Sequence, residues 1–326
     1  MTSALVINET GGPEVLQWQD IELESPKAGE VRIKHTAAGL NYIDTYFRQG
    51  IFPLPNMPGI LGAEGVGVIT ELGDGVSDLS VGDRVVYSAG FGSYCLERNI
   101  LAEKLVKVPD DIDDITAAGC FSKGTTAEFL LLRAYPRDIQ PGDYILVHAA
   151  AGGVGQILCQ WANHLGANVI GTVGSEEKAE VARNHGCRDV INYSTEDFVE
   201  RVSDITDGKG VCVVFDAVGK STFEGSLDCL QPRGFLINFG TASGPPPKVD
   251  PTDLMHKGSV YVTRASLFHY NATPADLSAS AEKLFAVIRE GGVKVNVNQT
   301  YPLQDAAQAH QDLADRKLIG STVLIP

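Results

Sequence analysis

The sequence predicts an α/β fold in which a doubly wound parallel sheet is joined to a mainly β segment. The central observation is a glycine-rich turn at 148–155, which stands between an apolar run at 143–147 and a helical pattern at 156–162. Apolar runs and helical patterns then alternate as far as residue 239, as they do in parallel sheets. The earlier part of the chain instead carries short β-type runs that Gly and Pro clusters separate.

The glycine-rich turn is typical of the start of a dinucleotide-binding fold. Gly152, Gly153 and Gly155 match the later part of the G-x-G-x-x-G pattern, whereas Ala150 replaces its first glycine. Glycines let the backbone approach a pyrophosphate, and the helix that follows offers unpaired N–H groups and the positive end of its dipole. We expect a nucleotide at this turn; a purely structural turn between a strand and a helix is the alternative.

The runs after this turn supply the other strands of the expected sheet, with helical patterns such as 177–182 between them. They lie at 168–173, 189–193, 211–216 and 234–239.

The end of the second strand indicates which dinucleotide binds. NAD sites usually place Asp or Glu there, on the ribose 2′-hydroxyl, but this chain has Gly174 and Ser175, with Lys178 one helical turn later. A hydroxyl and a point cation suit a 2′-phosphate, so we expect NADPH. Glu176 and Glu177 are expected to face solvent in the first helical turn. The alternative for Lys178 is a solvated helix residue.

The segments outside this alternating region predict a second domain. Apolar runs at 30–35, 65–70 and 83–87 indicate strands. Helical character begins near 113–118 and continues through 125–132. Near the C-terminus, a helical run at 275–290 precedes two expected strands at 294–297 and 321–325, and we expect this part to return to the first domain.

Composition narrows the class of protein. A length of 326 residues suggests about two domains, and no run approaches the ~18 apolar residues of a membrane span. The net charge of −15 argues against a general nucleic-acid partner, which requires clustered Lys and Arg. The N-terminus lacks a basic region and a cleavage site, and the six cysteines form no C-x-x-C pair. We therefore expect a cytoplasmic protein with no membrane partner.

With these features in hand, the chain resembles the medium-chain dehydrogenase/reductases, and within them the zinc-free quinone oxidoreductases related to zeta-crystallin. The order and spacing of the matching pieces carry this resemblance over nearly the whole chain. The pieces are 38–46, 59–67, 81–85, 123–127, 149–155 and 239–240.

The resemblance implies a GroES-like, mainly β catalytic domain made from residues 1–124 and 268–326, with a Rossmann domain inserted at 125–267. It implies a homodimer whose interface uses the fifth-to-sixth strand region of each Rossmann domain. It also implies hydride transfer from NADPH, with quinones or other small electrophiles as acceptors and the nicotinamide in the cleft between the domains.

Zinc is not expected. Zinc-dependent relatives use a cysteine, a histidine and a second cysteine, but the matching positions here hold Asn41 and Ala63, and Cys120 is one residue out of place. Only Glu64 keeps its place, so too few ligands are left for a tetrahedral site. A quinone is already electrophilic and needs less activation than an alcohol, which suits a metal-free reductase.

The resemblance also assigns candidate site residues. Asn41, Tyr46 and Thr126 match positions beside the nicotinamide; Asn41 could donate to the acceptor oxygen, and Tyr46 could do the same or order a water. Structural roles for these three residues stay open. The remaining cofactor positions are Gly152, Gly153, Val154, Gly174, Ser175, Lys178, Tyr193, Phe239, Gly240, Thr241, Ala265, Ser266, Leu267 and Arg316.

Four further residues could contribute to the acceptor pocket, to phosphate binding or to acid/base chemistry. Phe52 stands where relatives often carry Tyr, so the acceptor pocket lacks that hydroxyl. Arg264 could steer the acceptor or a phosphate, or form a structural ion pair. Asp44 and Glu64 could act as an acid/base pair, but we expect them to organise the catalytic domain through hydrogen bonds.

Two other functions remain open beside quinone reduction. The same fold and cofactor would serve an enoyl or 2-alkenal reductase that acts on conjugated C=C bonds. A non-catalytic NADPH-binding protein with a structural or RNA-binding role is the third alternative. The retained Asn41, Tyr46 and Thr126 argue against it, as does the acidic charge.

Overall fold

The computed structural model describes residues 1–88 and 90–326, and its chain divides into two compact units. Unit 1 comprises Met1–Ser122, Thr273–Ala281 and Val295–Pro326, and unit 2 comprises Lys123–Ala272 and Glu282–Lys294. Two of the four boundaries fall inside helices, one in α2 (Asp114–Phe129) and one in α9 (Pro274–Arg289).

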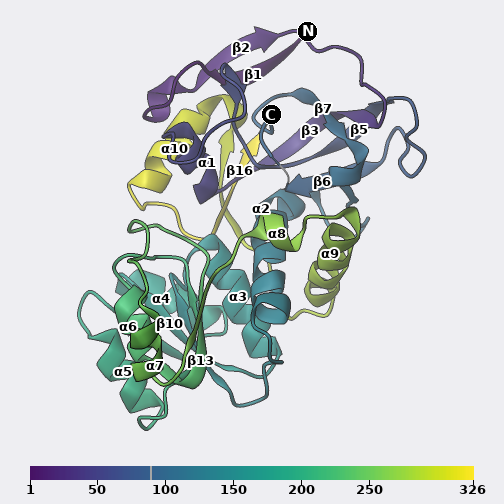
Figure 1. The fold of residues 1–326 in the computed structure, drawn as a ribbon. Coiled ribbons are helices and arrows are strands. Elements are labelled where there is room, and N and C mark those ends of the chain that lie inside the picture. Colours follow the sequence, from purple (N-terminus) through teal and green to yellow (C-terminus); the bar gives the residue numbers. More distant parts are fainter. Residues whose placement is uncertain (89) are drawn as a thin grey trace. The chain divides into compact units, whose positions relative to one another are not determined.

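Unit 2 is built on a parallel sheet with the strand order β11-β10-β9-β12-β13-β14. Figure 1 labels two strands of this sheet, β10 and β13. All neighbouring strands in it run parallel. The order reverses between β9 and β12, which is the switch point where α/β folds bind ligands, at the carboxyl ends of the strands. The strands are β9 (Tyr144–His148), β10 (Asn168–Val173), β11 (Asp189–Asn192), β12 (Val211–Asp216), β13 (Leu230–Asn238) and β14 (Tyr261–Arg264).

Helices of unit 2 connect these strands and cover their apolar residues. One core cluster joins Leu146, Ile170, Val214 and Leu236 of the sheet to Val202 of α5. The doubly wound fold expected from the alternating pattern is therefore confirmed. The helices are α3 (Gly153–His164), α4 (Glu176–Asn184), α5 (Phe198–Ile205), α6 (Phe223–Asp228), α7 (Pro251–His256) and α8 (Leu267–Tyr270), and a π-helical turn spans Leu130–Ala134.

Unit 1 is mainly β, as the separated apolar runs predicted. One sheet has the order β15-β16-β3-β5-β6-β8, with β7 pairing β3, and a smaller sheet has the order β2-β1-β4. C-terminal β16 pairs with β3, so both ends of the chain build this unit. The strands are β1 (Thr2–Ile7), β2 (Gln17–Ile21), β3 (Glu30–Leu40), β4 (Gly59–Ile60), β5 (Glu64–Leu72), β6 (Arg84–Ser88), β7 (Glu97–Leu101), β8 (Val106–Lys107), β15 (Val297–Pro302) and β16 (Ser321–Ile325).

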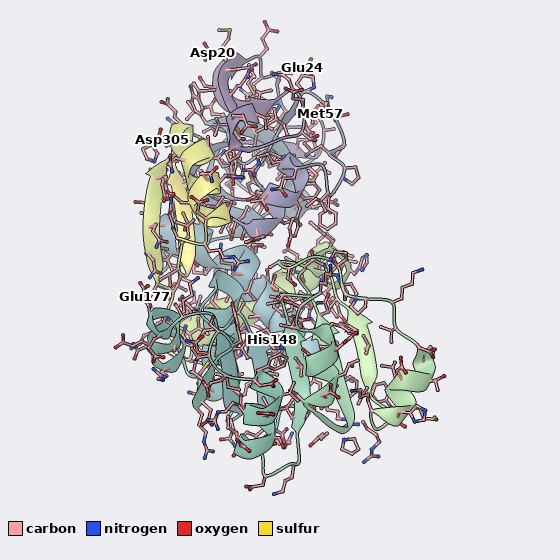
Figure 2. The ribbon with its side chains drawn as sticks, turned by 90° about the vertical axis from the view of Figure 1, so that its left-hand side faces the viewer. Asp20, Glu24, Met57, His148, Glu177 and Asp305 are labelled. Atoms are coloured by element: carbon pink, nitrogen blue, oxygen red, sulfur yellow. The ribbon has the colours of Figure 1, made fainter. Side chains whose placement is uncertain are left out.

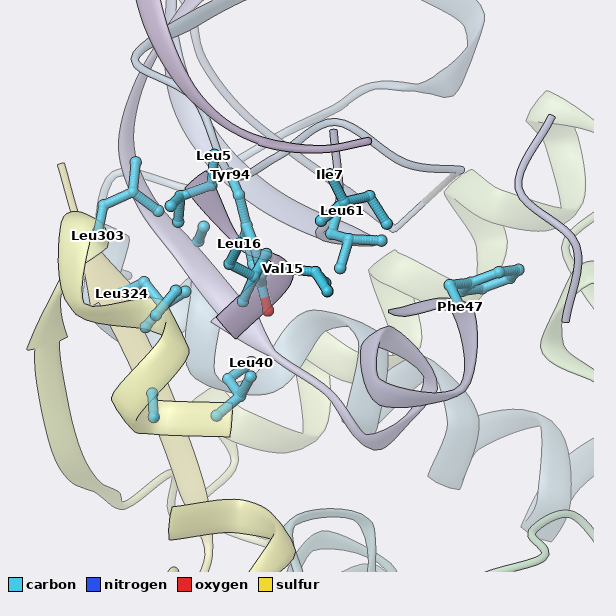
Figure 3. Close-up of a cluster of buried hydrophobic side chains, with 13 residues drawn as sticks. Leu5, Ile7, Val15, Leu16, Leu40, Phe47, Leu61, Tyr94, Leu303 and Leu324 are labelled. Carbon is cyan, nitrogen blue, oxygen red and sulfur yellow. The ribbon is translucent and has the colours of Figure 1, made fainter. Parts of the chain in front are cut away.

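Two helices and a core cluster bring distant segments of unit 1 together. The helices are α1 (Tyr42–Arg48) and α10 (Ala306–Ala314). Figure 3 shows part of the cluster, in which Leu5, Phe47, Leu61 and Tyr94 gather with Leu324 of β16. Burying several such side chains, at roughly 1.5 to 3 kcal/mol each, holds the C-terminal segment against the N-terminal one.

One strand prediction was wrong. The run at 294–297 was expected to be a strand, but β15 begins only at Val297. The backbone of Lys294 is occupied instead by the Gln160 side chain, which accepts from Lys294 N at 2.9 Å and donates to Lys294 O at 3.1 Å. These bonds satisfy the groups that a strand would have paired.

Candidate functional site

The glycine-rich turn of unit 2 joins β9 to α3 at the switch point of the sheet. Gly152 is the N-cap of α3 in an extended conformation, and its N–H donates to Ala149 O at 2.9 Å. A Cβ on Gly155 would overlap Ala149 O, so the turn can close this tightly only with glycine there. The first N–H groups of α3, including those of Gly153 and Val154, have no partner within the helix and can serve an anion.

The carboxyl end of β10 carries the residues expected at a 2′-phosphate. Ser175 is the N-cap of α4, and its Oγ accepts from Lys178 N at 3.3 Å. Tyr193, half-exposed, follows β11, and a Cβ on Gly174 would lie 2.6 Å from its hydroxyl. Gly174, Ser175, Lys178 and Tyr193 are thus neighbours, as a shared site requires.

The two acids near Ser175 lie in the first turn of α4, as expected. Glu176 pairs with Arg183 at 2.8 Å, and Glu177 is exposed. Figure 2 shows Glu177 at the surface of unit 2. Both acids stabilise the positive end of the helix, and Ser175 stands two residues after Val173, the last residue of β10.

The ends of β12, β13 and β14 are joined by Asp216 and Asn238, two residues that sequence reasoning missed. Asn238 Nδ2 donates to Asp216 Oδ2 at 3.1 Å and to Gly240 O at 3.0 Å. Arg264 donates to Asn238 Oδ1 at 2.6 Å. Both residues are almost fully buried, and their position at consecutive strand ends is the signal that could have identified them.

Backbone hydrogen bonds at the same strand ends fix two more of the predicted cofactor residues, Phe239 and Ala265. Phe239 N donates to Asp216 O at 2.8 Å, and Ala265 N donates to Asn238 O at 2.9 Å. Thr241 follows the same turn, and Ser266 is the N-cap of α8, which begins at Leu267. Thr126 lies half-buried on the part of α2 that belongs to unit 2.

His148 ends β9 beside the glycine-rich turn and is a structural residue. Its Nδ1 lies 2.8 Å from Thr172 Oγ1 and its Nε2 lies 2.9 Å from Ser226 Oγ. Burial lowers the pKa of His148 to about 4, so the ring is neutral near pH 7. Figure 2 places it among the strands of unit 2.

In unit 1, Asn41 is held by two buried carboxylates. It is the N-cap of α1, and its backbone N–H donates to Asp44 Oδ2 at 2.9 Å. Its side-chain Nδ2 donates to Glu64 Oε2 at 2.8 Å. Glu64 Oε1 accepts from Ser122 N at 2.7 Å, so that carboxylate is held at both oxygens. Asp44 and Glu64 therefore organise this region through hydrogen bonds, as expected from the sequence.

Tyr46 lies one turn further along α1 within an aromatic group. Its ring meets Tyr42 at a centroid distance of 5.7 Å and Phe52 at 5.5 Å, both edge to face. Partial burial and the neighbouring Tyr46 raise the pKa of Tyr42, while the positive charge of Arg316 opposes this increase. Of the predicted catalytic and cofactor-binding residues, Asn41, Tyr46 and Arg316 belong to unit 1 and the others belong to unit 2.

The donor residues do not suit a metal. Across residues 1–88 and 90–326, no three His, Cys, Asp or Glu side chains lie close enough together to hold an ion. Cys120 is buried, with its Sγ 3.8 Å from Ala117 O, and Ala63 offers no ligand atom.

Across the same described residues, 1–88 and 90–326, no helix is both long and apolar enough to span a bilayer.

The switch-point turn, the strand-end residues and the mainly β unit together define an oxidoreductase of the dinucleotide-binding class. Residues 27–137 match the family model of the alcohol dehydrogenase GroES-like domain, and residues 153–286 match that of the zinc-binding dehydrogenases. The chain belongs to the quinone oxidoreductase branch of the medium-chain dehydrogenase/reductase superfamily.

Three relatives illustrate this membership. The chain is 49% identical to a quinone oxidoreductase of Pseudomonas aeruginosa, covering 97% of each sequence. It is 46% identical to a 2-haloacrylate reductase of a Burkholderia species, covering 100% of this chain and 99% of the relative. The solved structure of Escherichia coli quinone oxidoreductase complexed with NADPH matches with a TM-score of 0.96 at 45% identity, covering 99% of this chain and 100% of the other.

Proposed function

We propose that this protein is an NADPH-dependent quinone reductase. The observation that carries the proposal is the end of β10, where Ser175 replaces the acid of an NAD site and Lys178 follows within the first turn of α4. Its relatives among the quinone oxidoreductases, one of them solved with NADPH, support the same activity.

The residues present suit this cofactor at both ends. The turn at Gly152, Gly153 and Val154 would hold the pyrophosphate, and Ser175, Lys178 and Tyr193 would hold the 2′-phosphate and adenosine. NADPH, when bound, supplies the hydride. The backbone at 239–241 and 265–267, with Thr126, would hold the nicotinamide half, and Arg316 would be a further contact to the cofactor.

The acceptor side falls to Asn41 and Tyr46. Two-electron reduction of a quinone takes up one hydride and one proton, so the protein has to orient the acceptor and let a proton reach its oxygen. Asn41 Nδ2 donates to Glu64 Oε2 at 2.8 Å and, over a longer distance, to Gly39 O at 3.4 Å, so an acceptor oxygen would take the place of the longer of these two bonds. The Tyr46 hydroxyl would donate directly or through water.

The choice of cofactor can be tested at Ser175. Ser175→Asp keeps a good N-cap for α4 but places an acid where the 2′-phosphate would bind. We expect KM for NADPH to rise by at least about tenfold, equivalent to about 1.4 kcal/mol, while KM for NADH changes little. Ser175→Asn keeps the cap without the charge and serves as the control. Equal effects of both variants on the two cofactors would contradict the assignment.

Activity itself is tested with chelator-treated protein. NADPH and NADH oxidation would be measured with 1,4-benzoquinone, 9,10-phenanthrenequinone and a short enal. NADPH-dependent turnover of a quinone that survives chelation supports the proposal. Turnover of the enal alone would refute it.

Reduction of a conjugated C=C bond is the second candidate. A 2-haloacrylate reductase shares 46% identity over the whole chain, and such an acceptor also takes a hydride and a proton. The rates on the enal and on the quinones, measured side by side, separate the two activities.

We also propose a homodimer in the cytoplasm, built from domains at 1–124 with 268–326 and 125–267. Strand β14 is an edge of the sheet in unit 2, and Tyr261, Thr263 and Arg264 on it are exposed. An open edge readily pairs with a second copy. Sedimentation should give twice the 34.8 kDa of one chain, and Thr263→Lys should shift the protein toward monomer.

The cysteines support the proposed location in the cytoplasm. All six are free thiols, as a reducing compartment favours.

A further inference from the structure

A chain of hydrogen bonds runs through the core of unit 1 from Arg48 to Asp44. Arg48 Nη1 lies 3.0 Å from His310 Nδ1, His310 Nε2 lies 3.1 Å from the Tyr94 hydroxyl, and that hydroxyl lies 3.0 Å from Asp44 Oδ2. The four residues come from α1, α10 and the segment before β7, and each is at most 1% exposed. Figure 3 shows Tyr94 among the apolar side chains that surround part of this chain.

The chain has a single direction. A guanidinium group only donates, so His310 Nδ1 accepts from Arg48 and the ring proton sits on Nε2. His310 then donates to the Tyr94 oxygen, which leaves the Tyr94 O–H to donate to Asp44. Burial, with a smaller contribution from the charge of Arg48, lowers the pKa of His310 to about 3, so the ring is neutral and carries one proton.

Asp44 passes this constraint to the predicted site. Its Oδ2 also accepts from Asn41 N at 2.9 Å, and its Oδ1 accepts from Ala63 N at 3.0 Å. Ala63 precedes Glu64, whose carboxylate holds the Asn41 side chain. Asp44 therefore fixes the backbone of Asn41 directly. Through Ala63 it also fixes the segment that carries Glu64, the partner of the Asn41 side-chain amide.

We propose that Tyr94 and His310 are positioning residues for quinone reduction, because they orient the Asp44 carboxylate and, through it, the amide of Asn41. This inference rests on the proposed function, in which Asn41 faces the acceptor. The burial of both residues keeps them from contact with the acceptor. Four polar side chains are costly to bury, and the geometry that they fix is a reason to retain them.

The test compares Tyr94→Phe with Tyr87→Phe. Tyr87 is an equally buried tyrosine of unit 1 whose hydroxyl lies 2.8 Å from His35 Nε2, outside the chain that ends on Asp44. We expect Tyr94→Phe to lower kcat by about tenfold, since small displacements of a positioned group cost this much or more. Tyr87→Phe should keep kcat, and the two variants should lose similar thermal stability.

Two further readouts separate positioning from stability. Tyr94→Phe removes a hydrogen-bond donor from the Asp44 carboxylate, which raises the pKa of Asp44. The acid limb of the kcat profile should therefore move to higher pH. The other charged or titratable groups facing Asp44 are Glu64 and, beyond Tyr94, His310 and Arg48. His310→Leu should behave like Tyr94→Phe. His310→Gln, which offers one acceptor and one donor, should restore most of kcat.

The outcomes are distinct. Variants at Tyr94 and His310 that lose stability but keep kcat and the pH profile would refute the positioning role. A wild-type protein that reduces no quinone would instead refute the proposed function, and the same variants are then compared with the enal, the acceptor of the second candidate. A loss of kcat with the enal supports the positioning role even then, and an unchanged kcat overturns it.

Discussion

At the scale of single residues, Asn41 depends on the pairing of a donor with an acceptor. Its Nδ2 donates to Glu64 Oε2 at 2.8 Å, and Glu64 is fully buried. Asn41→Asp has nearly the same shape but replaces this donor with a second acceptor beside a carboxylate. We expect kcat/KM for quinone reduction to fall at least about tenfold near pH 7.5, equivalent to about 1.4 kcal/mol.

The double variant Asn41→Asp with Glu64→Gln provides the control. The introduced glutamine could turn its oxygen to Ser122 N, which now donates to Glu64 Oε1, and its amide nitrogen toward the introduced aspartate. Asn41→Asp should also lose stability, because two acceptors then face each other, and the reversed pair in the double variant should regain part of it. If the single variant is as stable and as active as wild type, the hydrogen bond between Asn41 and Glu64 contributes to neither stability nor activity.

At the scale of elements, the backbone of the β9–α3 turn is packed so tightly that a methyl group added at different glycines should reduce stability to different extents. Gly155→Ala places a Cβ against Ala149 O, whereas a Cβ on Gly152 would lie 3.2 Å from the same atom. We expect Gly155→Ala to cost about 1 to 3 kcal/mol of unfolding free energy, as overpacking does, and Gly152→Ala to cost less. NADPH affinity should fall in the same order. Urea unfolding and a fluorescence titration measure both, and the reverse order would contradict the geometry.

The elements that the sequence could predict are those with a strong period. The five apolar runs from 143 to 239 and the turn between the first strand and α3 follow from alternation and glycine spacing alone. Strand β15 was misplaced because a single side chain, Gln160, takes up the backbone of Lys294. No periodic pattern records a bond of this kind between distant residues.

The same distinction applies to the candidate site. Ser175 and Lys178 could be found because they follow a recognisable strand at a fixed offset. Asp216 and Asn238 act across neighbouring strands, and Tyr94 and His310 act across 216 residues of sequence. Their roles depend on which segments the fold brings together, so the tertiary structure was needed to see them.

At the scale of the whole molecule, buried titratable groups couple stability to pH. Burial lowers the pKa of His35 to about 3, of His148 to about 4 and of His310 to about 3. Each is uncharged in the folded protein but gains a proton below about pH 6.5 when unfolded, so its stabilising contribution is lost as the pH falls. Burial raises the pKa of Asp44 from 3.8 to about 7. Between these two pH values the folded chain binds more protons at Asp44 than the unfolded chain does, so this group's contribution to stability increases as the pH falls.

Near pH 5 the three histidines therefore outweigh Asp44. The unfolded chain binds about three more protons at the histidines and the folded chain about one more at Asp44, a net of about two protons released on folding. The unfolding free energy should fall by roughly 2.7 kcal/mol for each unit of decreasing pH in this region. Urea unfolding between pH 7 and pH 4.5 measures that slope. His35, His310 and Asp44 lie in unit 1, where the net is one proton, and His148 lies in unit 2. If the units unfold separately, each transition should therefore show about half the slope, and a flat profile in both would mean that these histidines are protonated without unfolding.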